Sequence, residues 1–253
     1  MKASFLNHEK PLLVAMVQEE TPQAAIAVIL NSLQDGAEAF GIQLCILKPE
    51  YRTEETLRRI FAACHGKPIY ITSYREHYNK DFTDDECVEL LMLGLRAGAT
   101  ILDVMGDMYC KDPRQLTFLP EAVEKQKALI AQIHEMGGEV LMSTHLTSRL
   151  TEDEVMQFAR EQSARGADVI KIVDVANSED EEFASLATVR RLKKELGKPF
   201  LYLVRGSHTR VIRQLGPVFG VCAYLCVQTY LPITTKAQPL LRSSKAVRDN
   251  MIF

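Results

Sequence analysis

Short apolar runs recur along the chain, and a longer segment of mixed apolar and polar positions follows most of them. A continuous apolar run, rather than an alternating one, is typical of a strand that is covered on both faces, as in a parallel sheet. The pattern therefore predicts eight buried parallel strands. Their residue ranges are 11–17, 42–47, 68–74, 99–105, 139–144, 167–173, 199–204 and 221–227.

The segments between these runs carry the signals that start and stop helices. Thr83 with Glu86, and Thr151 with Glu154, have the spacing of a capping box. Gly36 closes the first segment, at a position where glycine commonly ends a helix. Helices are expected over residues 21–36, 53–66, 83–98, 120–138, 151–166 and 180–197, with a surface helix at 242–250.

Eight strands that alternate with helices indicate either a closed (β/α)8 barrel or an open doubly wound sheet. The strand count favours the α/β TIM barrel, and no Gly-x-Gly-x-x-Gly motif follows the first run. No linker or repeat divides the sequence, so we expect one barrel domain over residues 1–253. Active sites of such barrels lie at the carboxyl ends of the strands, so polar residues there are the candidates for function.

The composition and charge of the chain exclude several classes of partner. A net charge of −3 and a pI near 6.1 give no basic surface for a nucleic acid. The sequence has no run of 18 apolar residues that would span a membrane, and its first residues lack the apolar stretch of a signal peptide. Six scattered cysteines predict a reduced, cytoplasmic protein.

Lys171 lies inside the apolar run at 167–173, where a buried ammonium without a partner would cost several kcal/mol. Apolar surroundings lower the pKa of a lysine, and the neutral amine is the nucleophile that forms a Schiff base with a carbonyl substrate. His145 follows the preceding run and would transfer protons near neutral pH. The alternatives are a Lys171 that pairs with an acid such as Asp103 or reaches solvent, and a structural His145.

Arginines after the seventh run indicate an anionic substrate. Arg205, Arg210 and Arg213 lie there, and the planar guanidinium group suits a carboxylate or a phosphate. No glycine pair at the end of the eighth run marks a phosphate site, so a carboxylate is favoured. For any one of these arginines, the alternative is a solvated loop.

A metal site is a weaker rival. No His-x-His or His-Glu-x-x-His motif is present, and the six histidines are dispersed. We therefore predict no metal and no organic cofactor. The side chains that could supply ligands are Glu19, Asp103, Asp107, His145 and Asp174.

Three segments resemble the type I 3-dehydroquinate dehydratase family. They are residues 166–173 around Lys171, residues 139–155 with a Ser-x-His motif, and residues 206–238 with a later Phe-Gly and a closing loop. The likeness extends over about residues 11–240 and implies that Lys171 forms the Schiff base and that His145 transfers protons. It also implies a set of substrate-binding residues, which are Arg75, Ser143, Arg210, Thr234 and Gln238.

The likeness is incomplete near the second and third runs. The Glu-x-Arg-x-Asp motif of the family falls on Ile46, Lys48 and Glu50, so Lys48 would bind substrate with a charge but without the planar fork of arginine. The acid that helps to orient the histidine falls near Asn79, with Glu76 as an alternative.

The resemblance implies a hydro-lyase that converts 3-dehydroquinate to 3-dehydroshikimate and water through a Lys171 imine. It also implies a homodimer and a place in the shikimate pathway of aromatic amino acid biosynthesis. Two alternatives stay open. One is an imine-forming dehydratase or aldolase that acts on another polyhydroxylated keto compound, and the other is a non-catalytic barrel that binds a carboxylated metabolite.

Overall fold

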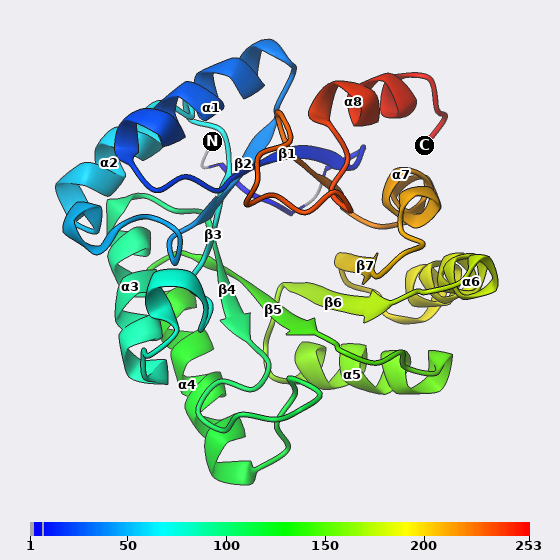
Figure 1. Cartoon of the computed structure of the whole chain (residues 1–253). Coiled ribbons are helices and arrows are strands. Elements are labelled where there is room, and N and C mark those ends of the chain that lie inside the picture. Colours follow the sequence, from blue (N-terminus) through cyan, green and yellow to red (C-terminus); the bar gives the residue numbers. More distant parts are fainter. Residues whose placement is uncertain (1–2, 7) are drawn as a thin grey trace.

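The computed structural model describes residues 3–6 and 8–253, and these form a nearly closed barrel of parallel strands surrounded by helices (Figure 1). The strand order is β7-β6-β5-β4-β3-β2-β1-β8. At the seam between β7 and β8, the backbone N–H of Cys222 donates to the Phe200 carbonyl at 2.9 Å. The predicted TIM barrel is confirmed.

The strands and helices alternate along the chain. The strands are β1 (Leu12–Val17), β2 (Ala39–Gln43), β3 (Ile69–Thr72), β4 (Ile101–Met105), β5 (Glu139–His145), β6 (Val169–Val175), β7 (Phe200–Arg205) and β8 (Ala223–Cys226). The helices are α1 (Pro22–Gln34), α2 (Glu54–Ala62), α3 (Asp84–Ala97), α4 (Pro120–Glu135), α5 (Glu152–Ala164), α6 (Glu179–Glu195), α7 (Arg210–Phe219) and α8 (Leu241–Asp249), with short 3₁₀ helices η1 (Pro49–Tyr51) and η2 (His77–Asn79).

Strand β2 lies earlier in the chain than the sequence predicts. The pattern predicted residues 42–47, whereas the strand is Ala39–Gln43 and pairs Gly41 with Tyr70 of β3. The apolar residues 44–47 are buried in the turn that follows. A buried turn and a buried strand produce the same apolar run, so burial alone misplaced this element by a few residues.

The helix signals are confirmed where the chain carries a capping residue. The Thr83 and Thr151 side chains both accept from the third residue of their helix, and both reciprocal glutamate bonds form. Helix α7 was not predicted. It has no side-chain cap and contains Gly216 and Pro217, residues that disfavour a helix interior.

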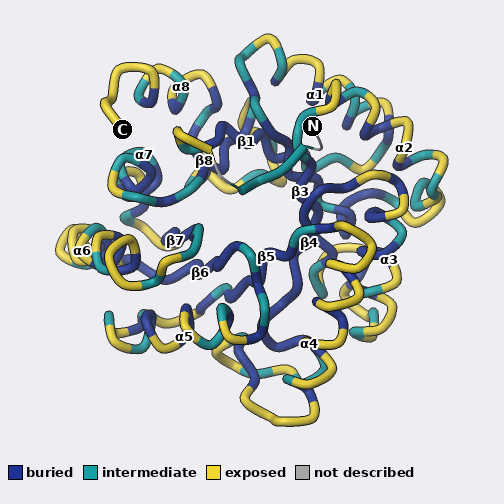
Figure 2. Tube along the Cα trace, turned by 180° about the vertical axis from the view of Figure 1, so that it is seen from behind, coloured by how far each residue is buried: buried dark blue, intermediate teal, exposed yellow. Residues whose placement is uncertain are grey.

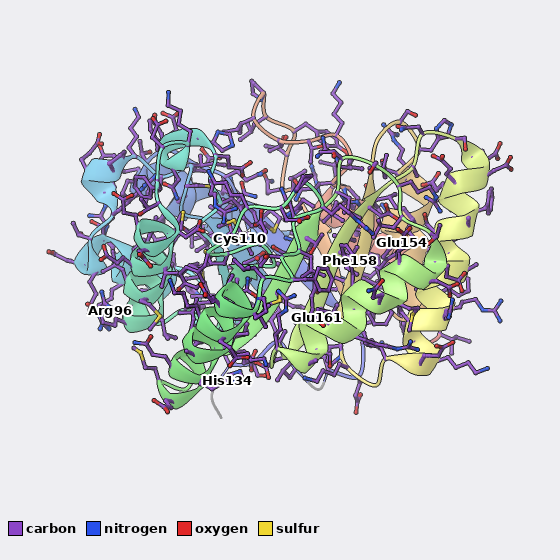
Figure 3. All side chains as sticks on the ribbon, turned by 90° about the horizontal axis from the view of Figure 1, so that it is seen from below. Arg96, Cys110, His134, Glu154, Phe158 and Glu161 are labelled. Atoms are coloured by element: carbon purple, nitrogen blue, oxygen red, sulfur yellow. The ribbon has the colours of Figure 1, made fainter. Side chains whose placement is uncertain are left out.

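Buried residues follow the strands, and the outer sides of the helices are exposed (Figure 2). The two ends of the barrel are distinguished in Figure 3. Cys110, after β4, and Glu154, early in α5, lie toward one end, while His134 and Arg96, near helix carboxyl termini, lie toward the other. The first end holds the carboxyl ends of the strands. Among the described residues, no helix combines the length and apolar character needed to cross a membrane.

Candidate active site

A cavity of about 500 Å³ opens at the carboxyl ends of the strands. Because side chains alternate along a strand, every second residue points into the barrel toward this cavity. The charged and polar residues that line it come from all eight strands or from the segments that follow them. They are Gln18, Gln43, Tyr70, Tyr74, Arg75, Glu76, Gln115, His145, Lys171, Arg205, Arg213, Thr235 and Gln238.

Lys171 lies at the centre of β6 and is 4% exposed. Its Nζ atom lies 2.7 Å from the Tyr74 hydroxyl, 2.9 Å from the Tyr70 hydroxyl and 3.3 Å from Asp103 Oδ2. The amine is therefore paired with an acid, which was one of the two alternatives left open by the sequence. Lys171 also lines the cavity, so a ligand in the cavity can contact it although it is paired with Asp103.

The Asp103 carboxylate is fully buried and satisfied by hydroxyl groups. Ser143 donates to its Oδ1 atom at 2.5 Å, and Tyr74 donates to Oδ2 at 2.5 Å. Tyr70 also donates to Oδ2 through a short hydrogen bond. Ser143 does not line the cavity, so the structure gives it a role in holding Asp103 rather than a direct contact with a ligand.

The pKa of Lys171 is lowered from its ordinary value of 10.5. Burial in the barrel is the largest cause, because it disfavours the charged amine. The Asp103 carboxylate opposes this shift, while the positive charge of Arg213 adds to it. A larger fraction of Lys171 is therefore neutral near pH 7 than for an exposed lysine.

His145 ends β5, next to β6, and its ring packs edge-on against Tyr74 with 5.0 Å between ring centroids. Burial holds the pKa of His145 well below 6.5, and the positive charges of Lys171 and Arg213 lower it further. The imidazole is therefore neutral at pH 7 and able to accept a proton. Among the hydrogen bonds of the described residues, none joins its ring to a carboxylate.

Gln115 positions His145 and was missed by the sequence interpretation. Its Oε1 atom accepts the backbone N–H of His145 at 2.9 Å, and its carbonyl accepts the Thr144 hydroxyl at 3.1 Å. The residue lies in the long loop after β4 with a φ of 51°. No local motif marks such a contact, because it joins residues 30 positions apart.

Of the two arginines on α7, Arg213 lines the cavity and Arg210 does not. Arg210 is the first residue of α7, is exposed and does not line the cavity. Arg213, one helical turn later, is 8% exposed, and its Nε and Nη2 atoms donate to the Val204 carbonyl at 3.2 and 2.9 Å. No carboxylate of a described residue pairs with Arg213. The family resemblance implied Arg210 as the carboxylate-binding arginine, and that role stays a prediction; the arginine of α7 that lines the cavity is Arg213.

Arg75 lines the cavity but is held by two acids. Its guanidinium contacts Asp84 at 2.5 Å and Asp107 at 2.9 Å, and it also donates to the Asp107 carbonyl at 3.1 Å. These bonds join the loop after β3 to the start of α3 and to the loop after β4. Arg75 therefore fixes the rim of the cavity, with little of its hydrogen-bonding capacity left for a ligand.

Lys48 and Thr234 lie away from the cavity, whereas Gln238 lines it. Lys48 pairs with Glu20 at 3.2 Å near the surface. The Thr234 hydroxyl bonds to the backbone of Leu231 beside a small neighbouring pocket. Gln238 is 7% exposed, and its Oε1 atom has no hydrogen-bond partner among the described residues. The cavity thus has a buried, unpaired acceptor in its wall.

Strand β2 contributes a neutral surface to the cavity. A Cβ atom on Gly41 would lie 2.4 Å from the Met16 sulfur and 3.0 Å from the Tyr70 ring, so this position points into the barrel. Gln43, two residues later, lines the cavity and accepts the Gln18 amide at 2.9 Å. Gly41 and Gln43 are therefore inward positions of β2. The sequence did not indicate this, because it predicted the strand at residues 42–47.

Asn79 and Glu76, the two residues considered for orienting His145, differ in whether they line the cavity. Asn79 is buried, where it bonds to Arg52 and donates to Ser73, and it does not line the cavity. Glu76 lines the cavity and lies near Cys45, with 3.8 Å between the sulfur and Oε1. The hydrogen bonds of the described residues do not link either side chain to His145.

The rival metal site is not assembled. Within residues 3–6 and 8–253, no three histidine, cysteine or acidic side chains form a group that could hold a metal ion. Asp107 is bound to Arg75, and Asp174 accepts the Tyr202 hydroxyl at 2.8 Å on the outer side of β6.

The family model and a curated relative indicate the same family. The family model described as type I 3-dehydroquinase matches residues 14–239. A curated 3-dehydroquinate dehydratase from Alkaliphilus oremlandii (strain OhILAs) is 28% identical over 96 residues, which are 37% of this chain and 38% of that protein. The aligned segment therefore spans less than half of that relative.

Solved structures support the fold over almost the whole chain. The 3-dehydroquinate dehydratase of Geobacillus kaustophilus HTA426 has a TM-score of 0.81 at 14% identity, covering 95% of this chain and 91% of that chain. The type I enzyme of Clostridium difficile, solved with covalently modified comenic acid, has a TM-score of 0.80 at 15% identity, covering 96% and 92%. At these identities the likeness establishes the fold.

Proposed function

The chain belongs to the type I 3-dehydroquinase family, and on this basis we propose that it is an imine-forming hydro-lyase for a carboxylated, hydroxylated ketone. One observation carries the proposal. Lys171 combines a lowered pKa with a position on the wall of the cavity beside a neutral His145. A buried nucleophilic amine next to a proton acceptor is the arrangement that Schiff-base catalysis requires.

Lys171 would attack the ketone carbon and form an imine with loss of water. The imine is an electron sink that acidifies the neighbouring C–H bond. His145 would remove that proton and return it to the departing hydroxyl group, after which water hydrolyses the imine and frees Lys171. Because the lysine itself supplies the electron sink, the reaction as proposed uses no organic cofactor.

The anionic group of the substrate would bind at Arg213, on α7. A buried guanidinium without an acid partner is costly, and a bound carboxylate compensates it through charge-assisted hydrogen bonds. Arg205, at the end of β7, lines the same side of the cavity and adds a second positive charge. Arg213 thus takes the role expected for Arg210.

The substrate to test first is 3-dehydroquinate, but one observation favours a different hydroxylated ketone as a second candidate. In the family motif, the Glu and the Arg are two residues apart, which is the spacing of two side chains that point into the barrel from one strand. In this chain, the inward positions of β2 are occupied by Gly41 and Gln43. Both charges are therefore absent from that wall. Neutral amides recognise hydroxyl groups without selecting a charge, so the hydroxyl pattern of the substrate would differ.

Turnover decides between these two candidates. Elimination of water from a β-hydroxy ketone produces a conjugated enone, whose ultraviolet absorbance is followed directly. Absorbance that rises with 3-dehydroquinate, and is lost in Lys171→Ala but kept in Lys48→Ala, would support dehydroquinate dehydration. Turnover only of other keto acids or ketoses would support the second candidate. Binding of carboxylates without any turnover would favour the non-catalytic barrel.

The cytoplasmic location, the homodimer and the role in aromatic amino acid biosynthesis are proposals supported by family membership. Light scattering after size-exclusion chromatography tests the dimer, because it measures the mass of the assembly against the 28.5 kDa of one chain.

A further inference from the structure

The Tyr74 hydroxyl lies between the reactive amine, a buried carboxylate and the cavity. It accepts from Lys171 Nζ at 2.7 Å and donates to Asp103 Oδ2 at 2.5 Å. Its side chain lines the cavity and is partly exposed. The phenol is therefore next to the position that a ketone oxygen would occupy when the ketone carbon approaches Nζ.

We infer that Tyr74, supported by Asp103, is the catalytic acid and base of imine formation, while His145 acts only on the carbon-bound proton. This inference rests on the proposed function, because it requires an imine at Lys171. It narrows the general proton-transfer role that the family resemblance implies for His145.

The proton path begins with the Lys171–Asp103 ion pair. The Tyr74 oxygen accepts a proton from Nζ while the phenol proton passes to Asp103, which leaves a neutral amine and a carboxylic acid. The amine lone pair then attacks the ketone carbon, and the C=O electron pair moves to oxygen. Oxygen takes the phenol proton, and Asp103 restores the phenol, so a protonated carbinolamine and a carboxylate result.

The same pair of residues completes the imine. The carbinolamine nitrogen returns a proton through Tyr74 to Asp103, and the resulting acid delivers it through Tyr74 to the carbinolamine hydroxyl. The nitrogen lone pair forms the C=N bond as the C–O bond breaks and water leaves. The sum is ketone plus ammonium giving iminium plus water, with Asp103 and Tyr74 returned to their starting states.

His145 is less suited to this work. Its ring meets the Tyr74 ring edge-on, and no hydrogen bond of the described residues joins it to Nζ or to an acid that would hold the proton between steps. Tyr70 also contacts Nζ and Asp103 and lines the cavity, but it is only 1% exposed, whereas Tyr74 is partly exposed. Tyr74 is therefore the more accessible of the two phenols to a ligand, and Tyr70 positions Asp103.

The test compares Tyr74→Phe, Tyr70→Phe and His145→Gln in the rate at which cyanoborohydride traps an imine on Lys171. Acetone serves as the probe beside 3-dehydroquinate, because a small neutral ketone needs no anion or hydroxyl contacts. Rates are read by intact mass, at hydride concentrations where the rate no longer depends on hydride. Tyr74→Phe should slow trapping about 100-fold, while His145→Gln stays within about threefold of the wild type. Tyr70→Phe should slow trapping less than Tyr74→Phe does, because it removes only a hydrogen bond that positions Asp103.

Trapping at the wild-type rate in Tyr74→Phe, or a loss in His145→Gln as large as in Tyr74→Phe, would overturn the inference. A wild-type protein that traps neither ketone would overturn the proposed function itself, so the two failures are distinguishable. If Tyr74→Phe does not fold, 3-fluorotyrosine at position 74 keeps both hydrogen bonds and acidifies the phenol. Its trapping profile should shift to lower pH, and an unchanged profile would contradict the inference.

Discussion

The amine of Lys171 and the hydroxyl of Tyr74 lie 2.7 Å apart on the wall of one cavity, and both contact the buried Asp103 carboxylate. This contact connects the fold to the chemistry. Residues from β3, β4 and β6 converge because the inward side chains of a parallel barrel share one interior. The lysine is consequently held at a fixed place and is surrounded by groups that can exchange protons with it.

The reactivity of Lys171 should depend on pH with a midpoint below 10.5, because burial lowers its pKa. The amine is protonated and unreactive below its pKa, so a lowered pKa extends reactivity toward neutral pH. Reductive methylation followed by peptide mapping measures this, with the exposed Lys80 as the internal control. Identical pH profiles for the two lysines would contradict the expectation.

Arg213→Gln should raise KM about 10- to 100-fold, because a charge-assisted hydrogen bond to the substrate anion is lost. Arg210→Gln is the matched control on the same helix. Its side chain is exposed and outside the cavity, so KM should not change. Steady-state kinetics on both variants checks the assignment, and a larger effect in Arg210→Gln would return the anion site to that residue.

His145→Ala should lower kcat about 100- to 10,000-fold, as expected for removal of a general base. In the wild type, the acid limb of the kcat profile should lie below pH 6.5, because burial and nearby positive charges hold the pKa of His145 well under that value. The base is active when neutral and is lost only when the pH falls through its lowered pKa. An acid limb above pH 6.5 would show that another group controls the rate.

Arg165→Met should destabilise the protein by about 2–4 kcal/mol, because it leaves buried polar groups unpaired. The Arg165 guanidinium donates to the carbonyls of Gly106 and Thr117 and to Gln126, and so holds the loop that carries Gln115. Arg160→Met, in the helix α5 that Arg165 caps, removes only an exposed pair with Glu195 and should change stability by less than about 0.5 kcal/mol. Denaturant unfolding of both variants measures the difference.

The barrel could be predicted because its signals are local. Continuous apolar runs marked the strands, and Thr83 and Thr151 marked helix starts that form as expected. Lys171 was conspicuous for a related reason, since a charged residue within an apolar run requires a physical explanation. Its alternatives, an acid partner or a reactive amine, turned out to be compatible, because Nζ pairs with Asp103 and still lines the cavity.

The parts that could not be predicted depend on three-dimensional placement. The buried apolar turn after β2 has the same sequence pattern as a strand, so the strand was predicted too late and Gly41 and Gln43 were not recognised as inward positions. Helix α7 has no side-chain cap and was not predicted, so the sequence did not indicate that Arg210 and Arg213 lie one helical turn apart. Tyr74 was given no specific role from the sequence, because only the register of β3, β4 and β6 brings its hydroxyl to Lys171.

Borohydride trapping of the wild-type protein with 3-dehydroquinate tests the central claim most directly. Intact mass and peptide mapping would locate the adduct, with Lys171→Ala as the negative control. A stable adduct on Lys171, absent from the variant, is the predicted result and would make dehydroquinate or a close relative the substrate. If neither 3-dehydroquinate nor any ketone of a wider panel gives an adduct on the folded protein, the account of Lys171 as an imine-forming nucleophile is wrong.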